Sequence, residues 1–196
     1  MIDNLTVSVT GACNSRCTMC NQWQGVADED LHTEGYEALF GKPEFTGVEY
    51  LNITGGEPFL RTDIEDVIEA IVAKMRNLKT LFVSTNGTRP KKTARFIEGF
   101  LEKHQDVALH VTVSIDGDRR TNKIVRGIDN YQRGLRTIEL CRAISERVGT
   151  MISTTLTPIN CSAETLKHLK KNADRFDSGF SFRMGASNEF YRNKEA

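Results

Sequence analysis

Three cysteines lie close together near the N-terminus, where the sequence CNSRCTMC holds Cys13, Cys17 and Cys20. Thiolates are soft ligands that suit zinc or an iron–sulfur cluster. A structural zinc takes a closed set of four ligands, whereas three thiolates on a cluster of four irons leave one iron open to a substrate or cofactor. No fourth cysteine lies nearby, so the spacing favours a cluster.

A zinc site remains an alternative for the same loop. His32 follows Cys20 by twelve residues and can complete a Cys3His set. Such a chain would be a zinc-binding structural or interaction module and not an enzyme. A disulfide framework fits less well, because the chain has five cysteines, an odd number.

A second chemical signal is the turn Thr54-Gly55-Gly56-Glu57-Pro58. Paired glycines let the backbone turn sharply and approach a ligand closely. The turn follows a predicted strand, so Glu57 is presented at the carboxyl end of that strand. Gly-Gly and Glu-Pro also occur in ordinary loops, and the turn becomes specific only beside the cysteine triplet.

Strands and helices alternate along the chain. Period-two patterns and buried apolar runs predict strands over residues 5–10, 48–54, 79–85, 107–116, 150–157 and 179–185. Helical spacing and capping signals predict helices over residues 33–40, 61–76, 90–104, 130–147 and 162–172. This alternation predicts parallel strands with right-handed crossovers and an α/β fold.

The strands are polar on one face. In 107–116, Leu109 and Val111 share one face with other apolar residues, while His110, Thr112 and Ser114 share the other. We therefore expect a curled sheet with helices on its apolar face and a polar lumen. The predicted fold is a partial (β/α)6 parallel barrel, a single domain over 1–196, whose last helix is short or missing. An antiparallel sheet with one face in water is less consistent with the intervening helices.

Charge and hydropathy exclude several classes of protein. The 196 residues carry 26 Lys plus Arg and 26 Asp plus Glu, so no net charge attracts nucleic acid. No apolar run approaches the roughly 18 residues of a membrane span, and the N-terminus does not look like a signal peptide. We expect a cytoplasmic protein with neither a membrane nor a nucleic acid as partner.

Together these motifs resemble the radical S-adenosylmethionine (radical SAM) superfamily. The resemblance runs from the first strand through TNG at 85–87, SIDG at 114–117 and RG at 126–127, and is closest to the peptide-maturase and molybdopterin-precursor cyclase branch. It implies that Cys13, Cys17 and Cys20 bind one 4Fe-4S cluster and are the catalytic residues.

The resemblance also implies which residues contact S-adenosylmethionine. Glu57 would accept a hydrogen bond from the methionyl amino group, and Arg126 would pair with the cofactor carboxylate. The full set of cofactor-binding residues that it implies is Gly55, Gly56, Glu57, Pro58, Thr85, Asn86, Ser114, Asp116 and Arg126.

The implied chemistry is reductive cleavage of S-adenosylmethionine to a 5′-deoxyadenosyl radical that abstracts hydrogen from a substrate. The substrate would be a peptide or small metabolite, and a flavodoxin or ferredoxin would donate the electron. Relatives in this branch carry further cysteines in a C-terminal extension, and no cysteine follows Cys161 here, so we expect no auxiliary cluster. An inactive fragment of a longer radical SAM enzyme is a further alternative.

Two further cysteines and one histidine are not part of these motifs. Cys141 lies among apolar residues of a predicted helix, so we expect it in the core. Cys161 is expected on the rim at the carboxyl ends of the strands, without a chemical role. His110, on the polar strand face, is equally consistent with a substrate contact and with an interior structural histidine.

Overall fold

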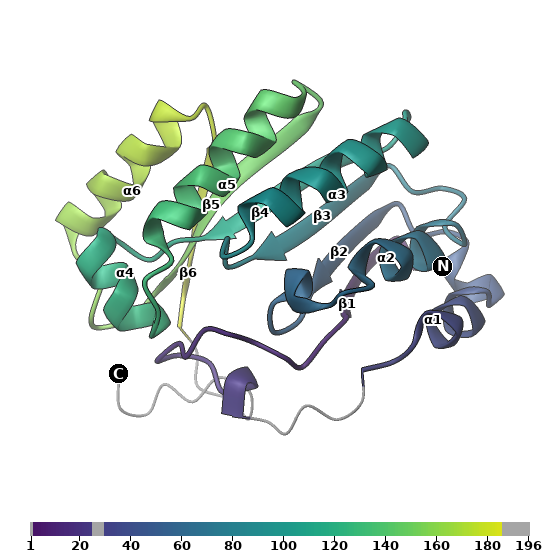
Figure 1. The fold of residues 1–196 in the computed structure, drawn as a ribbon, viewed down its shortest axis with the longest axis horizontal. Helices are drawn as coiled ribbons and strands as arrows, with labels where there is room; N and C mark the ends of the chain where they lie inside the picture. The colour runs from purple at the N-terminus through teal and green to yellow at the C-terminus, as the bar shows by residue number, and fades with distance from the viewer. Residues whose placement is uncertain (1, 25–29, 186–196) are drawn as a thin grey trace.

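The computed structural model describes residues 2–24 and 30–185. Six parallel strands form a single sheet in the order β1-β2-β3-β4-β5-β6 (Figure 1). Their bounds are β1 Asn4–Ser8, β2 Tyr50–Thr54, β3 Thr80–Thr85, β4 Ala108–Ser114, β5 Val148–Leu156 and β6 Gly179–Met184. The predicted parallel order is therefore confirmed.

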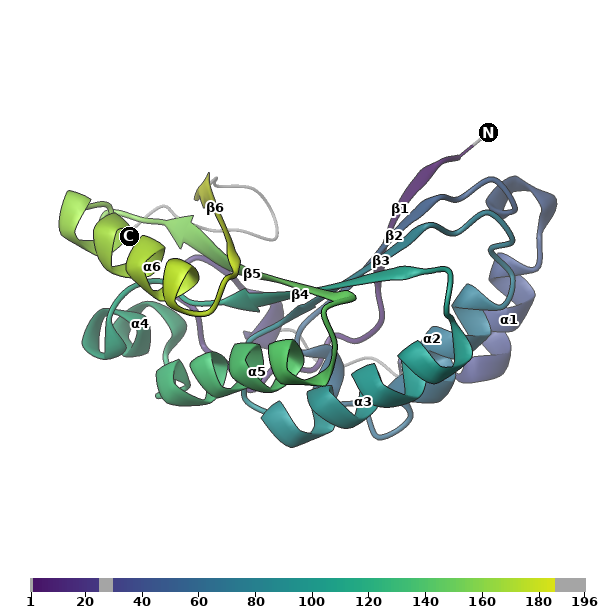
Figure 2. The ribbon, with the colours of Figure 1, turned by 90° about the horizontal axis from the view of Figure 1, so that it is seen from above.

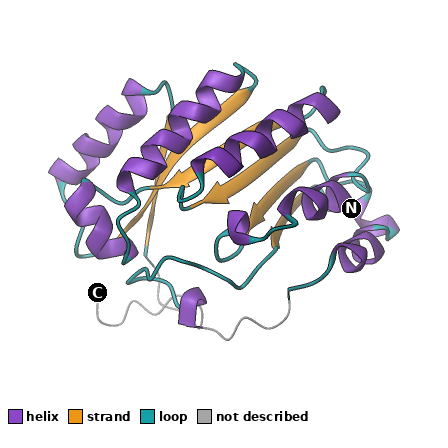
Figure 3. Cartoon of the chain, viewed as in Figure 1, coloured by secondary structure: helices purple, strands orange, loops and turns teal. Residues whose placement is uncertain are grey.

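Helices connect the strands and cover one face of the sheet (Figure 3). Their bounds are α1 Thr33–Phe40, α2 Ile64–Val72, α3 Pro90–Lys103, α4 Arg119–Arg126, α5 Tyr131–Ile144 and α6 Ala163–Arg175, with 3-10 turns η1 Gln22–Gln24, η2 Pro43–Phe45 and η3 Pro58–Leu60. Figure 2 shows the sheet curved like an open trough, with the helices on its outer side. This is the expected partial barrel.

The apolar strand face forms the core against the helices. Leu51, Leu81 and Leu109 are fully buried there, as are Ile64 and Ile71 on α2. The opposite strand face carries hydroxyl side chains and stays partly open, as the alternation predicted. Among the described residues, no helix is long and apolar enough to cross a membrane.

Helix α2 is shorter than the predicted 61–76. Pro58 begins the turn η3 first, and Arg61 then adopts an extended backbone conformation, with φ −58° and ψ 134°. The helix starts at Ile64 after Asp63. The spacing of Thr62 and Glu65 predicts a capping box at the start of this helix, and that prediction is wrong because Thr62 is not the N-cap residue. A proline-initiated turn can displace a helix start in this way, because it uses the residues that would form the first helical turn.

Helix α4 was not predicted, because Arg119–Arg126 lacks an apolar stripe and buries only Asn122 and Val125. Its end signals are nevertheless present in the sequence. The side chain of Asp118 accepts a hydrogen bond from the backbone of Thr121, and Gly127 ends the helix in the left-handed conformation, with φ 67°.

Two of the structural interpretations can be checked here. Cys141 is fully buried in the core, as expected, and Cys161 is exposed. The ring of His110 stacks on Phe82 with 5.1 Å between the ring centroids, and His110 is not among the residues that line the cavity described below.

Candidate active site

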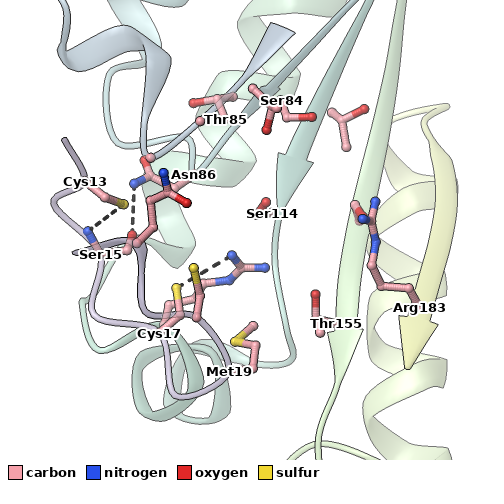
Figure 4. A pocket seen from close by; sticks show the side chains of 18 residues that line it. Cys13, Ser15, Cys17, Met19, Ser84, Thr85, Asn86, Ser114, Thr155 and Arg183 are labelled. Carbon is pink, nitrogen blue, oxygen red and sulfur yellow. Dashed lines mark hydrogen bonds between the residues drawn. The ribbon is translucent and has the colours of Figure 1, made fainter. Parts of the chain in front are cut away.

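A polar cavity opens on the concave face of the sheet, towards the carboxyl ends of the strands (Figure 4). Its wall contains the three clustered cysteines, the glycine pair and two arginines, Arg126 and Arg183. Hydroxyl groups from four neighbouring strands complete it, from Thr54, Ser84, Thr85, Thr112, Ser114, Ser153 and Thr155. No carboxylate is among the described residues that line it.

The cysteine loop lies on the C-terminal end of α4. The backbone N–H groups of Arg16 and Thr18 donate to the carbonyl oxygens of Arg126 and Val125, both at 2.9 Å. These carbonyls belong to the last turn of α4, which has no intrahelical donors left for them. The cysteine loop therefore supplies the hydrogen-bond donors that the end of α4 lacks, and α4 in turn fixes the position of the loop.

Side chains reinforce this contact. Val125 packs against Cys17 and Met19 in a small buried cluster, with Cys20 at its edge. Gly127 permits the close approach, because a Cβ atom there would lie 2.4 Å from the carbonyl oxygen of Arg16. The unpredicted helix α4 is thus the support of the predicted metal loop.

The TNG turn after β3 holds the other side of the cysteine loop. The side-chain Nδ2 of Asn86 donates to Oδ1 of Asn14 at 2.7 Å and to the hydroxyl of Ser15 at 2.9 Å. The side chain of Asn14 in turn donates to Thr88 at 3.1 Å. These three bonds hold the cysteine loop against the TNG turn.

The positions of the sulfur ligands fit a cluster better than a single zinc. One zinc needs its ligands gathered around one point, and within the described residues no three Cys, His, Asp or Glu side chains are gathered in this way. His32 lines a separate cleft with Arg61 and Asp63. An iron–sulfur cluster is larger, and each cysteine binds a different iron, which suits three thiols spread along one cavity wall.

Burial favours the protonated form of Cys13 and Cys17. It raises the pKa of Cys13 to about 11, although a hydrogen bond from the backbone of Ser15 opposes the shift. Burial also raises the pKa of Cys17, while the guanidinium of Arg126 opposes the rise. Because thiolates are the metal-binding form, binding of a metal must release these protons.

The glycine pair brings the second loop against the first. Gly55 has φ 137°, and a Cβ atom there would lie 2.5 Å from the carbonyl oxygen of Thr10. At Gly56 a Cβ atom would lie 2.1 Å from the carbonyl oxygen of Ala12. Only glycine fits at either position, so the cavity wall at this point is bare backbone.

Glu57 lies behind this wall. Its side chain is fully buried and does not line the cavity. The carboxylate accepts hydrogen bonds from the Thr85 hydroxyl at 2.7 Å, the Asn86 backbone at 2.6 Å and the Phe59 backbone at 3.2 Å. Burial raises the pKa of Glu57, although these three donors oppose the shift. Glu57 therefore links the turn at 54–58 to the TNG turn at 85–87 by hydrogen bonds.

Asp116 also lies behind the wall, fully buried, beside Arg126. Its Oδ2 atom is 2.5 Å from Nε of Arg126, an ion pair by distance in which neither atom makes an aligned hydrogen bond. Burial disfavours the charge of Arg126, but Asp116 and Cys17 raise the pKa of the guanidinium overall. The Nη1 atom of Arg126 lies 3.9 Å from the sulfur of Cys17.

The predicted contacts therefore fall into two groups. Those that line the cavity are Gly55, Gly56, Thr85, Asn86, Ser114 and Arg126. Glu57, Pro58 and Asp116 are buried behind it. Arg183 was not predicted, although it lies two residues after Ser181 on the same strand face and pairs in register with Thr155 of β5.

Comparison with known proteins identifies the family. The profile of the radical SAM superfamily matches residues 7–171. The chain belongs to the radical SAM superfamily.

Curated relatives include two enzymes named GTP 3′,8-cyclase. That of Shewanella denitrificans is 34% identical over 140 residues, which cover 64% of this chain and 39% of the relative. That of Photorhabdus laumondii is 30% identical over 151 residues, covering 71% of this chain and 42% of the relative. The chain thus spans about two fifths of these relatives' length.

Solved structures share the fold. Streptococcus suis SuiB bound to S-adenosylmethionine matches with a TM-score of 0.75 and 19% identity, covering 97% of this chain and 42% of SuiB. The protein anSMEcpe with bound AdoMet matches with a TM-score of 0.73 and 20% identity, covering 95% of this chain and 52% of that protein. The chain therefore shares the partial-barrel fold of these structures.

Proposed function

We propose that this chain reductively cleaves S-adenosylmethionine at a 4Fe-4S cluster and uses the product to remove a hydrogen atom from a substrate. Cys13, Cys17 and Cys20 would hold the cluster. When bound, the cluster and S-adenosylmethionine would supply a 5′-deoxyadenosyl radical, which is the reactive chemistry. The observation that carries this proposal is that the three thiols, the glycine pair and the hydroxyl-rich strand ends line one cavity.

The chain's own residues divide the remaining work. Gly55 and Gly56 offer backbone to the cofactor, and Ser114 offers a hydroxyl group on the cavity wall. The hydroxyl of Thr85 is bound to Glu57. Arg126 supplies a charge for the cofactor carboxylate. Glu57, Pro58 and Asp116 are buried, so in this proposal they position the wall and do not touch the cofactor.

The cavity also favours a class of substrate. Its described lining contains no carboxylate, and of its two guanidinium groups Arg126 is assigned to the cofactor, which leaves Arg183 for the substrate. Arg183 lies on β6, and no acidic side chain among the described residues forms an ion pair with it. A substrate with a carboxylate or phosphate group fits this wall. Small metabolites and peptides both qualify, and among the neighbours SuiB was solved with a precursor peptide.

An external protein must supply the electron. A flavodoxin or ferredoxin is the proposed donor, acting in the cytoplasm, where reducing conditions keep thiols free of disulfides.

The test is anaerobic reconstitution with iron and sulfide. We expect a brown protein with about four irons per chain, which forms 5′-deoxyadenosine from S-adenosylmethionine when reduced. Cys17→Ala should abolish iron retention, and Cys161→Ala, at an exposed thiol outside the cavity, is the matched control. A colourless protein holding one zinc would overturn the proposal. Iron binding without any cleavage would instead identify an inactive core.

A further inference from the structure

The ion pair of Asp116 and Arg126 lies directly behind the proposed cluster site. Arg126 reaches from the last turn of α4 to Cys17, with 3.9 Å between Nη1 and the sulfur. Its side chain is only 11% exposed, and that of Asp116 is not exposed at all. A buried guanidinium beside a sulfur ligand therefore has a buried carboxylate as its partner.

Asp116 is held in place by groups other than Arg126. Its Oδ1 atom accepts a hydrogen bond from the Thr155 backbone at 2.8 Å. Its own backbone N–H donates to Asn122 of α4 at 2.8 Å, and its carbonyl oxygen accepts from Asn160 at 3.0 Å. The backbone of Asp116 is thus fixed by Asn122 and Asn160, and its carboxylate cannot turn towards the cavity without breaking the bond from Thr155.

Charge at this position matters for electron transfer. Net charge and hydrogen bonds near the sulfurs set the reduction potential of an iron–sulfur cluster. An uncompensated positive charge beside Cys17 would stabilise the reduced, more negative cluster and raise its potential. A higher potential makes the cluster a weaker reductant.

We infer that Asp116 is a positioning and charge-compensating residue: it holds Arg126 against Cys17 and cancels its charge, which keeps the reduction potential of the cluster low. This inference rests on the proposed function, because it assumes a cluster at the cysteines. Arg126 can then offer N–H donors to the cavity without raising the potential of the cluster beside it.

The test is the midpoint potential of reconstituted Asp116→Asn, measured by an EPR-monitored redox titration without S-adenosylmethionine. Asparagine keeps the size of the side chain and its acceptor for Thr155. Arginine stays protonated in proteins, so the substitution leaves one uncompensated charge. We expect the ratio of reduced to oxidised cluster at a fixed potential to rise about tenfold or more, which equals a shift of about +59 mV or more for one electron.

Asp129→Asn is the matched control. Asp129 pairs at 2.7 Å with Arg119 of α4, the helix that also carries Arg126. Both side chains of this pair are solvent-exposed. Loss of that carboxylate should leave the potential unchanged. A general effect of disturbing α4 would shift both variants.

The outcomes distinguish a failure of the proposed function from a failure of the inference about Asp116. If the unsubstituted protein binds no iron, the proposed function fails. If Asp116→Asn binds iron with an unchanged or lower potential, only this inference fails. If Asp116→Asn loses iron, the double variant Asp116→Asn/Arg126→Gln removes both charges and should retain it; loss of iron from the double variant as well would overturn the inference.

Discussion

The carboxylate of Glu57 accepts a hydrogen bond from the backbone N–H of Asn86, with 2.6 Å between oxygen and nitrogen. These two residues belong to different loops, one after β2 and the other after β3. Asn86 also holds the cysteine loop through Ser15. A buried carboxylate that does not face the cavity therefore helps to set the shape of the cysteine loop.

Substitution of Glu57 should consequently lower stability as well as cofactor affinity. Glu57→Gln places an amide N–H₂ against existing donors and should cost about 1 to 3 kcal/mol of unfolding free energy. Glu57→Ala leaves three donors without a partner and should cost about 2 to 5 kcal/mol. Denaturant unfolding of the metal-free protein measures both, and a titration with S-adenosylmethionine should show weaker binding while iron is retained.

Glu139→Gln serves as the control for Glu57. Glu139 forms an exposed ion pair with Arg136 on α5, so its loss should change stability by less than about 0.5 kcal/mol. Wild-type stability in Glu57→Ala would contradict the positioning role of Glu57.

Gly127→Ala should impair iron binding specifically. The residue has φ 67°, and an added Cβ would lie 2.4 Å from the carbonyl oxygen of Arg16, so the cysteine loop must move. We expect less iron per chain after reconstitution. The control is Gly99→Ala in α3, where a Cβ meets nothing within 4 Å; it should stabilise the helix by up to about 1 kcal/mol and leave iron content unchanged. Equal iron in both variants would show that α4 does not hold the loop.

The start of α4 should make stability depend on pH. Hydrogen bonds from the backbone and side chain of Thr121 lower the pKa of Asp118, so the cap is stabilising above the unfolded pKa of about 3.9. Its contribution is lost as pH falls through the lower folded pKa. Asp118→Ala should cost about 0.5 to 2 kcal/mol at pH 7, and the difference from the wild type should shrink at pH 3. Unfolding curves at the two pH values test this, and a constant difference would argue against a charged cap.

Thiol alkylation of the metal-free folded protein should follow exposure and acidity. Cys161 is exposed, and we expect it to react first. Cys141 is fully buried, and burial raises its pKa to about 12, so it should react only after unfolding. Mass spectrometry of peptides after timed labelling gives the order. Early labelling of Cys141 would mean that the core opens around α5.

Much of this architecture was predictable from local patterns. Strand alternation placed Leu109 and Val111 in the core and Thr112 and Ser114 on the cavity side, because successive side chains of a strand point to opposite faces. The spacing of Cys13, Cys17 and Cys20 indicated one metal loop. The glycines at 55 and 56 indicated a close backbone approach, which the structure shows against Thr10 and Ala12.

The direction of side chains beyond the strand ends needed the tertiary structure. Loop residues have no period, so the sequence could not show that Glu57 and Asp116 turn away from the cavity while Arg126 reaches it. Asn86, the partner of Glu57, comes from another βα loop. Arg126, the partner of Asp116, lies at the end of α4, a helix that the apolar pattern does not indicate. Only the folded chain brings each residue to its partner. Residue types and spacing therefore indicated the family and the chemistry that we propose, whereas long-range contacts decided which side chains line the cavity and which are buried behind it.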